Sequence, residues 1–134
     1  MFLVDTSVWI DYINDKQTEQ VNYLDHLLSN PLAVGLTELI YLEILQGAKD
    51  QKSFSLFKSY FAGQNFYHFN DSLKSHTAAA QLYYDCRKKG ITIRSTIDCL
   101  IAQCAIENDL VLLHNDKDFK QITKVAKHLK LKSF

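Results

Sequence analysis

Four short apolar runs, each followed at once by polar turn residues, constrain the fold of this chain more than any other feature. The first run ends at Asp5, and the others cover Leu32–Leu36, Phe66–Phe69 and Leu110–Leu113. Apolar runs of this length between turn residues are typical of strands buried in a sheet. Strands that alternate with helices predict a three-layer α/β/α fold with a mostly parallel central sheet. The carboxyl ends of these strands should therefore lie together along one edge.

The segments between the runs have helical spacing and the end signals of helices. Val21, Leu24 and Leu28 recur on one helical face, and Thr37 precedes a helix that stops at Gly47. The remaining expected elements are helices over Val8–Ile13, Gln17–Ser29, Glu38–Gln46, Asp50–Phe61, Ser72–Lys89 and Ile97–Asn108, a short helix after Asp118, and an edge strand at Leu129–Leu131.

Length and composition predict a single domain over residues 1–134. With 134 residues, 47% of them apolar, the chain can bury a core of its own. No apolar run approaches the ~18–20 residues that span a bilayer, and no secretion signal is visible. The three cysteines form neither a CxxC pair nor a zinc spacing. We therefore expect no membrane partner and a reducing, cytoplasmic location.

Charge is unevenly distributed, although the formal net charge is zero. Residues 1–50 contain eight acids and two lysines, a net charge of −6, whereas residues 117–134 contain six lysines and one acid, a net charge of +5. This pattern argues against a protein that coats nucleic acid. It fits a small acidic site that needs a cation, with lysines nearby that can meet phosphates. The alternative for the basic end is a solvated helix surface.

Two acids in the first third of the chain are candidates for a functional site. Asp5 ends the first strand, and ligands of open α/β sheets bind in the crevice at the carboxyl ends of strands. The alternative is that Asp5 or Thr6 only caps the following helix. Glu43 shares a helical face with Leu39 and Ile40, so that it does not lie on a plainly polar side. The alternative for Glu43 is an ordinary surface residue.

Asp98 is the acid whose surroundings most favour a functional role. Its neighbours at one and two helical turns are Ile101, Ala102 and Ala105, all apolar. Burial of an unpaired carboxylate is costly or forces its protonation. In the first helical turn the helix dipole stabilises an ionised carboxylate by only about 0.3–1 kcal/mol, which is too little to offset the cost of full burial. A cation would supply the missing partner.

Asp116 and Asp118 follow the run Leu110–Leu113. One of them is expected to cap the last short helix. Asp116 lies nearer the strand end and so nearer the crevice, whereas Asp118 is expected to be the cap or a supporting partner. Carboxylates that meet at one edge repel each other unless a cation neutralises them.

An all-oxygen cluster of carboxylates is suited to Mg²⁺ or Mn²⁺. Such an ion activates water and stabilises charge on phosphoryl oxygens, which is the chemistry of phosphodiester hydrolysis. His114 stands alone beside the site, so the sequence lacks the histidine pair that metal-free ribonuclease chemistry would use.

Four segments of the chain resemble the motif blocks of PIN-domain proteins, and among these the VapC toxins of toxin–antitoxin systems. They are Leu3–Ile10, Glu43–Gly47, Thr96–Ala102 and His114–Phe119. The resemblance implies a PIN-like fold and an endoribonuclease that depends on Mg²⁺ or Mn²⁺, acting on RNA by metal-activated water. It also implies a homodimer, and a hetero-oligomer in which a VapB-type antitoxin protein covers the acidic site.

The resemblance also assigns roles to individual residues. Asp5, Asp98 and Asp116 match the acids associated with the metal, and Glu43 matches the fourth catalytic acid, acting directly or through water. The supporting positions are Thr6 and Ser7, whose hydroxyls orient the first acid, Arg94 and Thr96, which hold the substrate or the third acid, and Asn115 and Asp118 in the last block.

Two other functions are alternatives to a nuclease. A phosphatase with Asp5 as nucleophile usually needs a second acid two residues later, where this chain has Ser7. A non-catalytic module that binds RNA or protein is the second alternative, and the intact acids argue against it. No glycine-rich nucleotide-binding loop is present. Candidates for the dimer surface, with the core as their alternative, are Tyr41, Phe54, Phe57, Tyr60 and Phe61.

Overall fold

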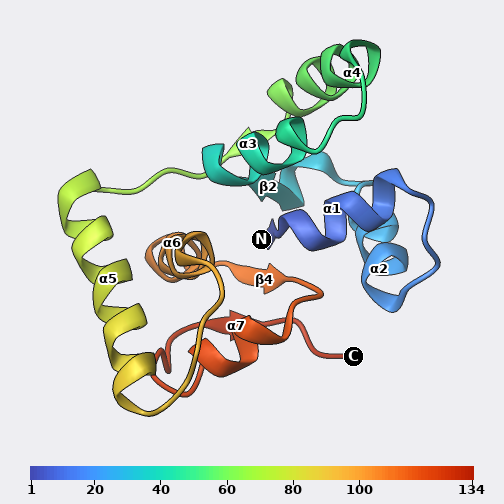
Figure 1. Ribbon diagram of the computed structural model, residues 1–134. Helices are drawn as coiled ribbons and strands as arrows, with labels where there is room; N and C mark the ends of the chain where they lie inside the picture. Colours follow the sequence, from blue (N-terminus) through green and yellow to red (C-terminus); the bar gives the residue numbers. More distant parts are fainter.

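The fold is built on a sheet of five parallel strands in the order β3-β2-β1-β4-β5 (Figure 1). A computed structural model describes residues 1–134. The strands are β1 (Phe2–Val4), β2 (Val34–Leu36), β3 (Asn65–Phe66), β4 (Val111–Leu113) and β5 (Lys130–Leu131). All four expected strands and the expected edge strand are therefore present.

Seven α-helices connect the strands. They are α1 (Thr6–Ile13), α2 (Glu19–Leu27), α3 (Glu38–Gln46), α4 (Gln51–Ala62), α5 (Ser72–Lys88), α6 (Thr96–Glu107) and α7 (Lys117–Ile122), and a 3₁₀ turn covers Pro31–Ala33. The chain steps from β1 to β2 and β3 in one direction and then returns past β1 to β4 and β5. Because crossovers between parallel strands are right-handed, α1–α4 and α5–α7 cover opposite faces of the sheet. The predicted three-layer α/β/α fold is confirmed.

The helix contacts follow the same division. α1 packs against α2 and α3, and α3 packs against α4, whereas α5, α6 and α7 pack against one another. In Figure 1 the first group occupies the upper right of the molecule and the second group the lower left. Contacts between α3 and α6 join the two groups. These two helices carry Glu43 and Asp98.

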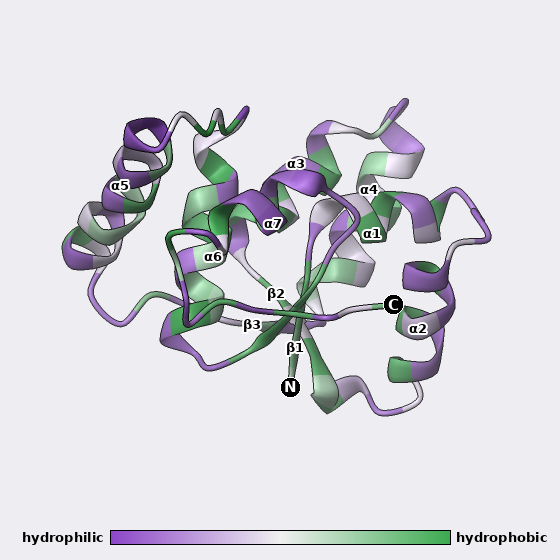
Figure 2. Cartoon of the chain, turned by 90° about the horizontal axis from the view of Figure 1, so that it is seen from below, coloured by the Kyte–Doolittle hydropathy of each residue, from purple (hydrophilic) through white to green (hydrophobic).

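The core lies on both faces of the sheet. Leu3, Leu36 and Leu112 are fully buried, together with Trp9 of α1 and Ile101 of α6. Because both faces are covered, the three central strands β1, β2 and β4 contain no polar side chain, as is typical of parallel sheets. Figure 2 shows this distribution, with hydrophobic strands at the centre and hydrophilic residues along the outer side of α5.

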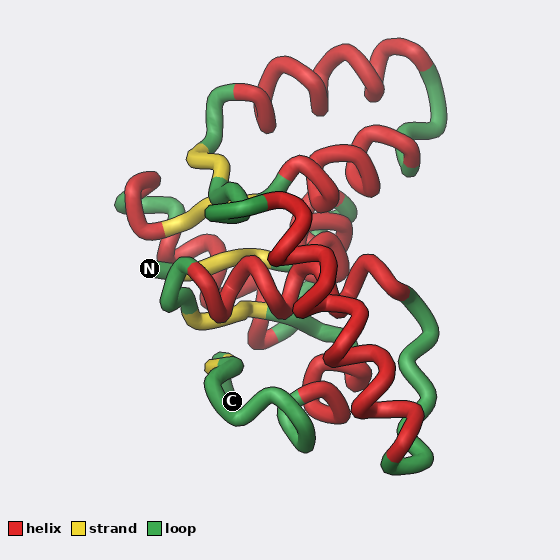
Figure 3. The backbone as a smooth tube through the Cα atoms, turned by 90° about the vertical axis from the view of Figure 1, so that its left-hand side faces the viewer, coloured by secondary structure: helices red, strands yellow, loops and turns green.

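Both chain ends lie on the same side of the molecule in Figure 3. The ring of Phe134 contacts that of Tyr23 at 5.8 Å between centroids, and Tyr23 contacts Phe2 at 5.5 Å. The segment after β5 thus returns to the amino edge of the sheet. The carboxyl edge remains available for a site.

Two strands, β2 and β3, are shorter than predicted by two residues each, for local reasons. The expected strand Leu32–Leu36 begins only at Val34, because Pro31 opens a 3₁₀ turn. The expected strand Phe66–Phe69 is limited to Asn65–Phe66. Tyr67 still donates its N–H to the carbonyl of Leu36 at 2.9 Å, but the chain then turns away from the sheet towards α5.

The aromatic residues of α4 divide between core and surface. Phe61 is only 1% exposed and packs edge-on against Trp9, with ring centroids 4.9 Å apart. Phe61 belongs to the core, so its proposal as a dimer-surface residue is wrong. Phe54 and Tyr60 are 38% and 45% exposed and remain candidates for a dimer surface, together with the half-buried Phe57. None of the helices combines the length and apolarity needed to cross a lipid bilayer.

Candidate metal-binding active site

The site begins where β1 and β4 end side by side. Val4 pairs with Leu113, and the N–H of Asp5 donates to the carbonyl of Leu113 at 2.9 Å. The connections that leave these two strands run in opposite directions, which makes their carboxyl ends a topological switch point. Asp5 and the turn that contains Asp116 therefore lie at the position where ligands bind in open α/β sheets.

α6 and α3 bring the other two predicted acids to the same edge. α6 precedes the parallel strand β4, so its first turn, with Asp98, lies at the carboxyl ends of the strands. α3 follows β2, and the hydroxyl of Thr6 donates to Oε1 of Glu43 at 2.7 Å. Asp98 lies close enough to Asp5, Glu43, Asp116 and Asp118 for each of these carboxylates to raise its pKa. All four predicted acids thus meet at one site.

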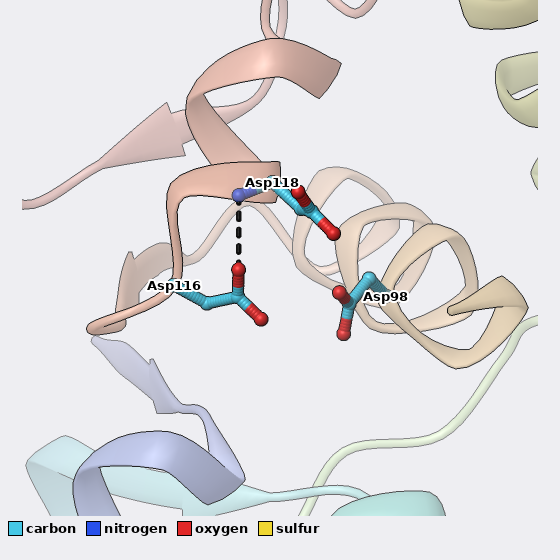
Figure 4. A group of neighbouring side chains, drawn as sticks. All are labelled: Asp98, Asp116 and Asp118. Atoms are coloured by element: carbon cyan, nitrogen blue, oxygen red, sulfur yellow. Dashed lines mark hydrogen bonds between the residues drawn. The ribbon is translucent and has the colours of Figure 1, made fainter. Parts of the chain in front are cut away.

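Asp98, Asp116 and Asp118 form the tightest group. One carboxylate oxygen from each lies within 4.8 Å of the others. Figure 4 shows the three side chains directed into a common space between α6 and the start of α7. One of the two acids caps α7, as expected: Asp116 accepts the N–H of Asp118 at 2.9 Å. Of the two roles predicted for Asp118, the cap is therefore excluded, and its buried carboxylate faces the site.

Asp5 caps α1, which was the alternative considered for it, and also lies at the carboxyl edge of the sheet. Its Oδ2 caps α1 by accepting the Ser7 N–H at 3.1 Å and the Ser7 hydroxyl at 2.6 Å. The same hydroxyl oxygen accepts the N–H of Asn115 at 3.0 Å. Ser7 therefore joins the ends of β1 and β4 and holds the first acid in place. Ser7 thus makes the contacts expected of a residue that orients the first acid. Thr6 was predicted to orient the same acid, but its hydroxyl donates to Glu43 instead.

Arg94 is the cation of the site. Its Nε donates to Oδ2 of Asp118 at 3.1 Å, and its Nη2 donates to Oδ1 of Asp116 at 2.9 Å. The side chain is 63% exposed, so these ion pairs lie at the solvent side of the acids. The two carboxylates raise the pKa of Arg94, and the main cause is the hydrogen bond that its side chain donates to Asp118.

The other supporting residues have different positions. Thr96 is the first residue of α6 and is exposed. Asn115 donates from Nδ2 to Oδ2 of Asp11 at 3.3 Å, so it ties the β4 turn to α1. Asp11 was not singled out from the sequence, although its position one helical turn after Ser7 is a signal that places both on one face of α1.

His114 stabilises the turn between β4 and α7. Its Nδ1 accepts the N–H of Asp116 at 3.2 Å, and its ring contacts Phe119 with centroids 5.2 Å apart. Burial lowers the pKa of His114, which favours a neutral ring.

Burial and mutual repulsion make two of the acids hard to ionise. Burial is the main cause that raises the pKa of Asp98 to about 7, followed by repulsion from Asp5 and the other carboxylates. No hydrogen bond or cation of the chain opposes this increase. Burial likewise raises the pKa of Asp5 to about 6, despite the hydrogen bonds from Ser7.

These residues fit a divalent cation. The donors are carboxylate oxygens, which hard cations such as Mg²⁺ and Mn²⁺ prefer. A cation between the acids would also remove the repulsion that raises the pKa values of Asp5 and Asp98. The arrangement is thus an incompletely neutralised acidic centre in which Arg94 compensates only Asp116 and Asp118.

Comparisons with known proteins identify the family. The family model of the PIN domain matches residues 2–125. A VapC ribonuclease of Mycobacterium bovis and Ribonuclease VapC11 of Mycobacterium tuberculosis are each 33% identical over 127 residues, 94% of both chains.

Solved structures agree in fold. VapBC2 from Rickettsia felis, bound to a promoter DNA fragment, contains a chain with a TM-score of 0.72 and 20% identity, covering 99% of this chain and 98% of that one. VapBC-1 from nontypeable Haemophilus influenzae gives a TM-score of 0.72 and 20% identity over 98% and 96% of the two chains. By its matched domain, its sequence relatives and its fold, this chain belongs to the PIN-domain family, among the VapC ribonucleases.

Proposed function

We propose that this protein is a metal-dependent endoribonuclease of the toxin class, with residues 1–134 acting as one PIN-like domain. The observation that carries this proposal is the convergence of Asp98, Asp116 and Asp118 within 4.8 Å, beside Asp5 at the switch point of the sheet. The relatives that share a third of the sequence are ribonucleases. The substrate is therefore RNA, and the reaction is hydrolysis of a phosphodiester.

Asp5, Asp98 and Asp116 are the proposed metal-binding acids, and Asp118 stands close enough to join them. A bound Mg²⁺ or Mn²⁺ would lower the pKa of water and stabilise charge on the phosphoryl oxygens. The raised pKa values of Asp5 and Asp98 support this assignment, because they show buried carboxylates that repel one another and that a bound cation would neutralise.

The remaining site residues orient water and substrate. The Thr6 hydroxyl donates a hydrogen bond to Oε1 of Glu43. The second carboxylate oxygen, Oε2, is then free to accept a proton from the attacking water. The oxygen of this water would form a bond to phosphorus while the bond to the 3′ oxygen breaks, and the leaving 3′ oxygen would take a proton from solvent. The products are then a 5′-phosphate and a 3′-hydroxyl. The exposed guanidinium of Arg94 is suited to donate to a phosphoryl oxygen at the solvent side.

The proposed partners follow from the relatives whose structures are toxin–antitoxin complexes. We assign this chain a VapB-type antitoxin, a homodimeric state and a hetero-oligomer of the two proteins. The exposed apolar side of α4, with Phe54, Leu56 and Tyr60, is a candidate for the dimer surface. Three unpaired cysteines support a cytoplasmic location, where thiols stay reduced.

The test is cleavage of labelled cellular RNA by purified protein that has been freed of antitoxin. Wild type is compared in Mg²⁺, Mn²⁺ and EDTA with Asp5→Ala, Asp98→Asn and the surface control Asp25→Asn. We expect discrete fragments with 5′-phosphates that require the metal, Asp5 and Asp98, and full activity of the control. Wild-type rates in Asp98→Asn or in EDTA would refute the proposal. A folded dimer that cleaves nothing with any metal would instead support a non-catalytic binding module.

A further inference from the structure

A groove of lysines begins at the wall of the acidic site. Its inner part, about 470 Å³ in volume, is lined by Lys89, Lys117, Asp118 and Lys124. Its outer part, about 510 Å³, is lined by Lys88, Lys89, Lys124 and Lys127. Lys89 and Lys124 line both parts, so the two depressions are continuous. We call the five lysines and the space between them the lysine groove.

The groove carries an uncompensated positive charge. Its walls contain two acids, Asp85 and Asp118, and Asp118 already pairs with Arg94. The five lysines take part in none of the ion pairs of the molecule. All five are exposed. Neighbouring like charges weaken the folded state, so these lysines are better explained by an anionic partner than by stability.

The position of the groove indicates which anion. Its inner wall includes Asp118, and Lys117 directly follows Asp116, so the groove leads away from the place where the scissile phosphate would bind. The outer part is lined by residues at the end of α5 and in the segment after α7. The helices α5 and α7 pack against each other, and Figure 1 shows the end of α5 beside α7. A strand held at the acids would carry its next phosphates along this row.

The lining also indicates how the strand is contacted. The groove contains no aromatic side chain on which a base would stack, and its other residues include Thr92 and Gln121. Lysines without stacking platforms contact the phosphate backbone rather than the bases. We propose that the lysine groove holds the backbone of single-stranded RNA on one side of the cleavage point. This inference rests on the proposed ribonuclease function.

The test measures RNA binding in EDTA, so that affinity is separated from cleavage. Binding of a fluorescent single-stranded 12-mer is followed by anisotropy over a range of KCl concentrations. The double variants Lys89→Gln/Lys124→Gln and Lys89→Glu/Lys124→Glu are compared with Lys52→Glu/Lys58→Glu, two exposed lysines of α4. Circular dichroism checks that every variant is folded.

We expect the groove variants to lose RNA affinity on the order of tenfold at low salt. The slope of log affinity against log KCl concentration, here called the salt slope, should become shallower by about 1.4, or ~0.7 for each lost phosphate contact. The KM for RNA in Mn²⁺ should rise in parallel, while the α4 control keeps the wild-type slope. Unchanged slopes in both groove variants would overturn the proposal. So would a loss of antitoxin binding with RNA affinity intact, because the groove would then hold a protein.

The two proposals fail in different ways. If wild type binds RNA with a slope that depends on Lys89 and Lys124 but cleaves nothing in Mn²⁺, the lysine groove stands and the nuclease assignment fails. If wild type cleaves RNA and the groove variants bind it as wild type does, the lysine groove fails alone.

Discussion

Arg94 holds Asp118 through two donors, with its Nε at 3.1 Å and its backbone N–H at 3.2 Å from the same oxygen, Oδ2. A third donor, Nη2, reaches Oδ1 of Asp116 at 2.9 Å. The Arg94 guanidinium thus donates to two of the three carboxylates, Asp116 and Asp118, that form the tightest acidic group with Asp98. A metal ion and Arg94 compete for the same negative charge.

Replacement of Arg94 by Met should therefore strengthen metal binding. We expect the affinity for Mn²⁺, measured by calorimetry, to increase on the order of tenfold, because no cation remains to compete for Asp116 and Asp118. Without metal the variant should melt at a lower temperature, since its acids lack a counter-ion. Arg87→Met, at the chain's other arginine, is the control. Weaker Mn²⁺ binding in Arg94→Met would mean that Arg94 mainly orients the acids.

The stability of the metal-free protein should fall as the pH rises. Asp98 and Asp5 have pKa values of about 7 and about 6 in the folded state, above the ordinary value of 3.8. The folded state therefore binds more protons than the unfolded chain between about pH 4 and pH 7, and this contribution to the free energy of unfolding is lost as the pH rises through that window. The lowered pKa of His114 acts in the opposite direction at low pH.

The comparison with Asp98→Asn isolates the contribution of Asp98. In EDTA at pH 8 we expect the variant to be more stable than wild type by at least about 1 kcal/mol, the equivalent of one pKa unit. The difference should shrink at pH 5.5. Urea denaturation of wild type, Asp98→Asn and Asp25→Asn provides the measurement. Equal wild-type and Asp98→Asn stabilities at both pH values would contradict the unpaired burial of this carboxylate.

Ser7→Ala should weaken both the fold and the site. The hydroxyl hydrogen-bonds to Asp5 and to the N–H of Asn115, so its loss should cost about 1 kcal/mol of unfolding free energy. It also removes an interaction that lowers the pKa of Asp5. The pH at which RNA cleavage reaches half its maximum should therefore move upward. Ser59→Ala, on the exposed surface of α4, should change neither quantity.

Phe61→Ala should be far more harmful than Phe54→Ala. Phe61 packs against Trp9 in the core, and removal of a buried phenylalanine costs about 3–5 kcal/mol. Phe54 lies on the same helix but is 38% exposed, so its replacement should cost less than about 1 kcal/mol in the monomer. Chemical denaturation of both variants checks this order. Similar costs would show that Phe54 is covered, as in a dimer.

Much of the fold could be predicted because the local signals agree with the tertiary structure. Thr37, Asp50 and Ser95 each cap a helix where the sequence suggests one. Gly90, with a φ of +76°, follows α5 as expected for a helix stop. The short strand Asn65–Phe66 was mispositioned because its pairing depends on β2 and not on its own residues.

The candidate site was predicted in part. The acids of four separate segments do lie at one edge, but the ion pairs of Arg94 depend on the approach of the loop before α6 to α7, which no local pattern encodes. Which of Asp116 and Asp118 caps α7 could not be decided from the sequence either, because both acids lie at the start of this short helix. Phe61 was misassigned because its burial depends on Trp9, a residue of a different helix.

The bond between Ser7 and Asn115 joins residues 108 positions apart. β1 cannot complete its pairing until β4 has been synthesised, so the acidic centre forms only through contacts of very large sequence separation. A ribosome that is still translating this message therefore carries an N-terminal segment in which Asp5 has no Asp116 beside it. The order of synthesis therefore makes the acidic centre one of the last parts of the fold to assemble, after β4 and the turn that carries Asp116 have emerged.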